Sequence, residues 1–133
     1  MPWIVTHIRS IMIVSGLLTM TMIYAAIAPQ AALQSTFGET VSGPVADIVI
    51  RNWGALITLI GAMLIYGAFN RPERLLILIV AGTSKAVFIA LVLAHGGRYL
   101  GKAGIPVAVD LVMIALFAWY VAAARSVAGG IRL

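Results

Sequence analysis

Lys85 and Asp110 are charged residues that lie inside long apolar stretches of this chain. An ammonium group at bilayer depth costs roughly 2.5–3.5 kcal/mol on insertion scales, so it needs a partner or water. A lysine and an acid at that depth can form a structural ion pair, hold a ligand or carry protons. The chemistry of the chain therefore depends on the segments that position these two side chains.

The composition indicates that a bilayer solvates much of the chain. Of its 133 residues, 62% are hydrophobic and 10% are charged, and a soluble domain of this size could not bury so much apolar surface. The net charge of +5 comes from basic residues that flank the apolar segments. This distribution favours anionic lipid headgroups as partners and argues against nucleic acid. Cysteine is absent, which excludes disulfides and thiolate metal sites.

Four apolar segments each approach the roughly 20 residues that a helical span needs. They cover about 4–28, 49–69, 75–94 and 105–124. The runs are too long and continuous for barrel strands. The sequence therefore predicts an all-α integral membrane four-helix bundle, with residues 1–133 forming a single transmembrane domain. We expect the first span to be retained, because its apolar run is longer than that of a signal peptide.

Prolines and polar residues mark the expected connections between the spans. Pro29 ends the first apolar run, and a polar loop over 30–43 follows. Pro44 is a favourable first residue for the second helix. Residues 70–73 predict a tight hairpin, and the glycine-rich stretch 95–104 predicts a loop before the fourth span.

The charges differ between the two predicted ends of the bundle. One end carries Arg9, Arg71, Arg74, Arg125 and Arg132 with Glu73, whereas the other carries Arg51, Arg98 and Lys102 with Glu39 and Asp47. The end richer in arginine and lysine is expected to be cytoplasmic. This orientation places both termini in the cytoplasm of a multi-pass protein of the inner (plasma) membrane. Trp53 and Tyr99 then lie near the opposite interface, as aromatic anchors do.

Small residues recur at helical spacing on two of the predicted spans. The second span carries Gly54, Thr58 and Ala62, and the third carries Gly82, Ala86, Ala90 and Ala94. Small side chains let helix backbones approach closely in lipid, so we expect these ridges to pack against neighbouring helices. The less favoured interpretation is that one ridge contacts a membrane protein partner or a second copy of the chain.

The predicted depths allow one polar cluster to form in the outer half of the bundle. At about 1.5 Å per residue, Lys85 lies about 13 Å and Asp110 about 8 Å below the outer helix ends. Arg51 enters from the same side, and Tyr24 and Thr21 of the first span have compatible depth. The cluster is either a structural ion pair that fixes helix register, or a binding or proton-linked site. The first interpretation is favoured.

Cofactor and metal sites lack support in the sequence. His7 and His95 lie at opposite ends of predicted spans, so one subunit could not clamp a haem or a metal ion with both. Ser84 precedes Lys85 directly, and neighbouring residues on a helix point about 100° apart, so a nucleophilic pair is not expected. We therefore expect no cofactor, no metal ion and no catalytic residue.

Several segments together resemble a known group of membrane proteins. They are the stretch 29–38 with its Phe37-Gly38 pair, the run Arg51-Asn52-Trp53-Gly54, the basic Lys85 in the third span and the acidic Asp110 in the fourth. In these features the chain resembles the DoxX-like small four-helix membrane proteins, including the BphX-like branch. The resemblance implies a four-helix membrane bundle and little settled function. It also implies arginine and glutamate where this chain has Lys85 and Asp110.

These observations favour a protein that performs no catalysis of its own. The expected role is an accessory subunit, or a bundle that holds a lipophilic small molecule among its helices. The alternative is a small transporter or channel in which Lys85 and Asp110 move protons or a solute. A membrane enzyme is the third expectation.

Overall fold

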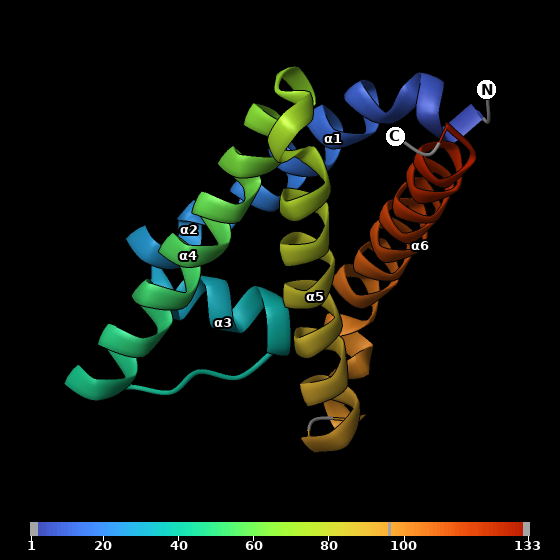
Figure 1. Ribbon diagram of the computed structural model, residues 1–133. Coiled ribbons are helices and arrows are strands. Elements are labelled where there is room, and N and C mark those ends of the chain that lie inside the picture. The colour runs from blue at the N-terminus through green and yellow to red at the C-terminus, as the bar shows by residue number, and fades with distance from the viewer. Residues whose placement is uncertain (1–2, 96, 132–133) are drawn as a thin grey trace.

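The computed structural model describes residues 3–95 and 97–131, and these residues form helices joined by short connections (Figure 1). The elements are α1 (Trp3–Met20), α2 (Ile23–Ile27), α3 (Pro29–Phe37), α4 (Pro44–Phe69), α5 (Arg71–His95), the 3-10 helix η1 (Gly97–Tyr99) and α6 (Leu100–Ile131). No strand occurs among the described residues. The all-helical prediction is therefore confirmed.

Four helical segments are long and apolar enough to cross a membrane. They cover Trp3–Ile27, Pro44–Phe69, Arg71–His95 and Gly97–Arg125. The prediction of four helices that are long and apolar enough to span a membrane is confirmed, and each predicted membrane portion largely coincides with one of these segments. The helices are longer than the predicted portions of the later spans because they begin in the polar flanks, as α4 does at Pro44. Proline is suited to that first position because its missing N–H would be unpaired there.

Two predicted loops are largely helical. Within 30–43, the chain forms α3, which begins with Pro29 and ends at Gly38 in the left-handed conformation with φ 78°. Glycine adopts this conformation without a steric penalty, so it ends helices readily. Within 95–104, η1 leads directly into α6, which continues through Pro106. In Figure 1, α3 lies crosswise to α5, beside the half of α5 that leads to its C-terminal end.

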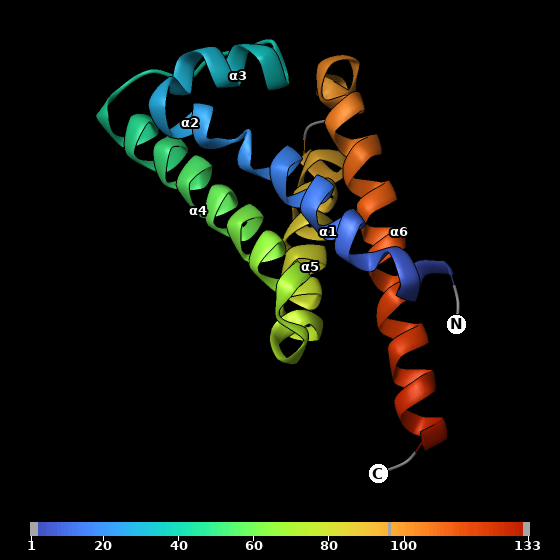
Figure 2. The ribbon, with the colours of Figure 1, turned by 90° about the horizontal axis from the view of Figure 1, so that it is seen from above.

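The closest helix contact joins the first span to α4 (Figure 2). A Cβ atom added to Gly16 would lie 2.7 Å from the carbonyl oxygen of Gly61, and one added to Gly54 would lie 2.5 Å from the nitrogen of Ala26. Glycine alone permits these separations between backbones. Gly54 therefore packs closely against a neighbouring helix as expected, and that helix is α2. Thr58 is half-buried and donates a hydrogen bond to the Gly54 carbonyl at 2.7 Å.

The other predicted small residues do not form tight contacts inside the bundle. Ala62, Ala86 and Ala90 are exposed, and a Cβ added to Gly82 would meet Phe117 only at an ordinary 3.9 Å. The expectation that Ala62, Ala86, Ala90 and Ala94 build the bundle is therefore wrong, whereas Gly82 is half-buried against α6. Lys85 is buried on α5, and Ala86 follows it by one residue, so Ala86 points about 100° away from the interior.

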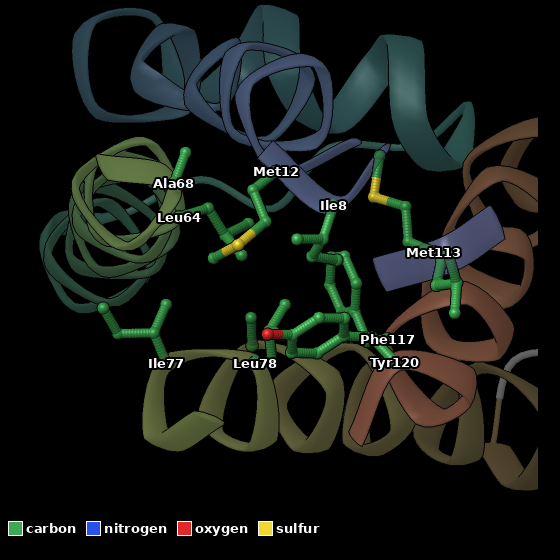
Figure 3. Packing of buried hydrophobic residues seen from close by; sticks show 11 residues of the cluster. Ile8, Met12, Leu64, Ala68, Ile77, Leu78, Met113, Phe117 and Tyr120 are labelled. Atoms are coloured by element: carbon green, nitrogen blue, oxygen red, sulfur yellow. The ribbon is translucent and has the colours of Figure 1, made fainter. Parts of the chain in front are cut away.

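A hydrophobic core lies between α1, α4, α5 and α6. Figure 3 shows Ile8, Met12, Leu64, Leu78 and Phe117 pointing toward one another from these helices. This core occupies the part of the bundle near the start of α1 and the α4–α5 turn. At the other end, Ile89, Val92, Ala103 and Val107 join α5 to α6.

The start of α1, the α4–α5 turn and the last turns of α6 lie toward one side of the molecule (Figure 1). The arginines assigned to the predicted cytoplasmic end lie on these elements, except that Arg132 and the C-terminal Leu133 are outside the described residues. The charged residues that were predicted to lie at the same end of the bundle therefore do so where the structure describes them. Which end faces the cytoplasm stays a prediction.

Candidate functional site

Lys85 forms a buried link between three helices. Its Nζ lies 3.0 Å from Oδ1 of Asp110 on α6 and donates a hydrogen bond to Oγ1 of Thr19 on α1 at 3.1 Å. The Thr19 hydroxyl in turn donates to the Ser15 carbonyl at 2.7 Å. Lys85 is 8% exposed, and the Asp110 side chain is 20% exposed. The structure therefore brings Lys85 and Asp110 together, as their depths predicted.

The polar groups of this link are paired. Two of the three protons that an ammonium group offers have acceptors in Asp110 and Thr19. No buried side-chain nitrogen or oxygen among the described residues lacks a hydrogen-bond partner. Neither of the two pockets described below is lined by Lys85 or Asp110. The arrangement is suited to fixing the register of α5 against α1 and α6.

Thr21 does not belong to this link. It is exposed, and its hydroxyl donates to the Leu18 carbonyl at 2.6 Å. Thr19 takes the position expected for Thr21 because it continues the buried face of α1, which includes Ile8, Met12 and Ser15. The three-to-four-residue spacing of that face was the sequence signal that could have identified Thr19.

Arg51 and Tyr24 lie in a separate polar region, around the junction of α2 and α3. Arg51 pairs with Asp47 at 2.8 Å and donates to the carbonyls of Ala26 at 2.6 Å and Ile27 at 3.3 Å. These carbonyls lie where α2 ends, and helix ends leave carbonyls without intrahelical partners. Arg51 thus secures the end of the first span.

Tyr24 connects α2 to the crosswise helix α3. Its hydroxyl donates to the Ala31 carbonyl at 2.7 Å and lies 2.8 Å from Oγ of Ser35. The expectation of one polar cluster drawing on all four spans is therefore wrong. The chain folds back at α3, which supplies its own partners for Tyr24.

A cluster of aromatic rings lies at the α3 end of the bundle. It comprises Phe37 of α3, Trp53 of α4, Phe88 of α5 and Tyr99 of η1. The ring centres of Phe37 lie 6.5 Å from Trp53, 6.4 Å from Phe88 and 5.6 Å from Tyr99, and Trp53 stacks on Phe88 at 6.5 Å. These separations are in the range of favourable aromatic pairs.

These rings form much of the lining of a pocket of about 350 Å³, which we call the aromatic pocket. Leu33, Leu91, Val92 and His95 complete its lining. The pocket is a shallow hollow that is largely open to its surroundings. Its lining is chiefly apolar and aromatic, as that of small-molecule sites is. Trp53 and Tyr99 were expected only as interface anchors, and the pocket itself was not predicted. Its four rings come from four separate segments, so no sequence spacing relates them.

Charged side chains fix Tyr99 at the edge of the aromatic pocket. The Tyr99 hydroxyl donates to Oε1 of Glu39 at 3.1 Å. Arg98 lies 3.4 Å from Glu39 Oε2, and its guanidinium carbon lies 4.7 Å from the centre of the Tyr99 ring. His95 is exposed at the end of α5 and contributes an imidazole to the lining. The pocket therefore combines an apolar interior with a polar margin.

The second histidine has a local role. His7 Nδ1 lies 2.9 Å from the Trp3 carbonyl, and the His7 ring stacks on Trp3 with centres 4.5 Å apart. His7 is in the first turns of α1, whereas His95 ends α5. Within the described residues, no group of three or more His, Asp or Glu side chains could hold a metal ion.

The four apolar helices identify a small membrane protein by their length and composition. No protein-family model, curated protein or solved structure matches the chain. Its role therefore follows from the chemistry of its own sites.

Proposed function

We propose that this protein binds a lipophilic small molecule with a flat unsaturated ring in the aromatic pocket, and that it catalyses no reaction on it. The observation that carries the proposal is the convergence of Phe37, Trp53, Phe88 and Tyr99 around a pocket of about 350 Å³. Aromatic faces attract flat rings through offset stacking and edge contacts. His95 at the margin offers one hydrogen bond to a polar substituent on such a ring.

The location of the aromatic pocket supports entry from the bilayer. Leu91 lines the pocket and is 55% exposed on α5, and α5 is a span. A molecule dissolved among lipid chains can therefore reach the rings sideways. On the other side, Leu33 and Phe37 of α3 line the pocket.

The Lys85 link supports this function indirectly. It ties α5, which carries Phe88, to α1 and α6 through Thr19 and Asp110. A pocket that is already formed before a ligand arrives loses less conformational entropy on binding. Lys85 and Asp110 are thus positioning residues in this proposal and do not touch the ligand.

Transport is the second candidate, because a lysine and an aspartate within spans are a common feature of proton and solute pathways. Transport is less favoured, since neither of the two pockets is lined by Lys85 or Asp110.

A role as an accessory subunit is compatible with ligand binding, and the exposed Ala86 and Ala90 leave a smooth surface on α5 for a partner. We further propose that the chain is related to the DoxX-like membrane proteins and that it lies in the inner membrane.

Thermal unfolding of the purified full-length protein in detergent tests the proposal. Phenanthrene serves as the flat-ring probe and decane as the straight-chain control. A ligand present at 100 times its Kd stabilises the folded state by about 2.7 kcal/mol, so phenanthrene should raise the midpoint and decane should not.

Two substitutions give the matched comparison for this experiment. Phe88→Leu removes a ring from the pocket, whereas Tyr66→Leu removes an exposed ring elsewhere on α4. The phenanthrene shift should disappear in the first variant and persist in the second. Equal shifts with phenanthrene and decane, or equal shifts in both variants, would contradict binding in the aromatic pocket.

A further inference from the structure

A second pocket lies at the opposite end of the bundle from the aromatic pocket. It has a volume of about 590 Å³ and lies between the first turns of α1, the end of α4 and the start of α5. Its polar lining comprises Thr6, Arg9 and Ser10 of α1 with Arg71 and Arg74 of α5. We call it the arginine pocket. Its location at the ends of spans puts it at the boundary between bilayer and water.

The arginine pocket is lined by three arginines and by no acidic residue of the part of the chain that the structure describes. Glu73 lies nearby in the first turn of α5 but forms no ion pair with the described residues. The ion pairs among the described residues all involve other groups: Arg51 with Asp47, Lys85 with Asp110, and Arg98 with Glu39. Arg9 and Arg71 are exposed. The Arg9 guanidinium lies 5.5 Å from the centre of the Phe69 ring, which orients it at the pocket wall.

Arg74 adds a fixed charge to this site. It is only 5% exposed, and it donates from Nε to the Gly67 carbonyl at 3.0 Å and from Nη2 to the Ala68 carbonyl at 2.8 Å. These carbonyls belong to the last turn of α4, whose dipole compensates part of the positive charge. Neutral carbonyls do not cancel a full charge, so an anion in the pocket would complete the compensation.

Thr6 and Ser10 provide hydrogen-bond donors on the facing wall. They are four residues apart on α1, so they lie on the same face of the helix. Two hydroxyls and Arg9 on α1, across from Arg71 and Arg74 on α5, suit an anion whose oxygens point in many directions, as those of phosphate do. Arginine binds phosphate oxygens through paired N–H groups.

We propose that the arginine pocket binds a phosphate group. Anionic phospholipid headgroups and soluble phosphate share this chemistry, and basic pockets between spans are known to take lipid headgroups. Arg9 and Arg71 supply the exposed charges, Arg74 the buried one, and Thr6 and Ser10 the neutral donors. This site is independent of the ligand in the aromatic pocket, because the two pockets share no lining residue.

Native mass spectrometry of the full-length protein in detergent tests this site. The probes are dioleoylphosphatidylglycerol, dioleoylglycerol, which lacks the phosphate, and inorganic phosphate. The variant is Arg9→Gln/Arg71→Gln, which leaves the Arg74 hydrogen bonds to α4 in place. Its control is Lys102→Gln/Arg125→Gln, which removes the same charge from exposed residues that do not line the arginine pocket.

The wild type should retain dioleoylphosphatidylglycerol in preference to dioleoylglycerol. Loss of charged hydrogen bonds should weaken retention roughly tenfold or more in Arg9→Gln/Arg71→Gln, and the control variant should bind like the wild type. Binding should also decrease with added NaCl, since salt screens exposed charges. Thermal midpoints of all the proteins without lipid show whether each variant is folded, and Arg9→Lys/Arg71→Lys should restore retention.

The outcomes separate the two sources of phosphate. Selective retention of the phospholipid identifies a headgroup site. If inorganic phosphate at millimolar concentration raises the thermal midpoint of the wild type but not that of Arg9→Gln/Arg71→Gln, and the phospholipid does not bind selectively, the source is soluble. Equal retention of the two lipids without any effect of inorganic phosphate, or equal loss in both glutamine variants, would overturn the proposal.

Discussion

Lys85 Nζ lies 3.0 Å from Asp110 Oδ1 in the interior of the bundle. The two residues are 25 positions apart in sequence, on adjacent spans. Because the same nitrogen also bonds to Thr19, one side chain ties together α1, α5 and α6. An ion pair that few water molecules reach is costly to break, since the remaining partner stays buried with an uncompensated charge.

Single substitutions at this pair should therefore be more harmful than the double substitution. Lys85→Met and Asp110→Asn should each lower the free energy of unfolding by about 3 kcal/mol, and the double variant should recover part of the loss. Chemical unfolding in detergent, followed by circular dichroism, gives these values. Losses that simply add in the double variant would mean that the two residues do not interact.

Glycines at the contact of the first span with α4 should tolerate no side chain. Gly61→Ala places a Cβ 2.7 Å from the Gly16 carbonyl oxygen, so it should reduce stability by about 1–3 kcal/mol. Gly101→Ala is the matched helical control, because a Cβ there meets nothing within 4 Å, and alanine favours helix by roughly 0.5–1 kcal/mol. Gly82→Ala should resemble the control. A stable Gly61→Ala variant would contradict the close approach of the helices.

The sequence was sufficient to predict the spans, because a long apolar run in a chain of this composition has few alternatives to a membrane helix. It was also sufficient to pair Lys85 with Asp110, since an isolated charge at bilayer depth requires a partner. The prediction failed for α3, where a segment that contains several polar residues was taken as a loop. Helix formation there depends on Pro29 at its start and Gly38 at its end, and on the walls that α4 and α6 provide.

The faces of the helices were harder to predict than their positions. Lipid chains and protein interiors are both apolar, so hydrophobicity does not distinguish the outer face of a span from its inner face. Ala86, Ala90 and Ala94 of α5 were assigned to the interior because small residues allow close packing, although they are exposed. The aromatic pocket depends on four segments meeting at α3, and such a meeting follows only from the folded chain.

The distribution of arginine predicts that the α4–α5 turn is cytoplasmic. Reporter fusions after Asn70 should be active as cytoplasmic markers, and fusions after Gly38 should be active as external markers. The first site follows α4 and the second follows α3, so the two lie at opposite ends of the bundle (Figure 1). The reverse activities would place the arginine pocket on the external side.

A binding protein without a transport cycle should give no flux that depends on Lys85. Liposomes containing the purified protein and a pH-sensitive dye should acidify at the same rate with wild type and with Lys85→Met/Asp110→Asn. The double variant is used because it removes the charges together and leaves no unpaired one. A proton flux that is present in the wild type and lost in this folded variant would favour the transport alternative.

Fluorescence of Trp53 measures ligand binding in the aromatic pocket most directly. The chain has three tryptophans, and Trp3 and Trp119 stack on each other with ring centres 6.1 Å apart, away from this pocket. Trp3→Phe/Trp119→Phe therefore leaves Trp53 as the sole reporter. Pyrene, which accepts tryptophan excitation, is the probe, and phenanthrene and decane are the unlabelled competitors.

Titration with pyrene in lipid nanodiscs should quench Trp53 to saturation. Phenanthrene should reverse the quenching and decane should not, and the further change Phe88→Leu should weaken the saturable binding whereas Tyr66→Leu should leave it intact. Quenching that rises without saturation in every variant, or that decane reverses as well as phenanthrene does, would show that pyrene only dissolves in the lipid and that the aromatic pocket does not bind flat rings.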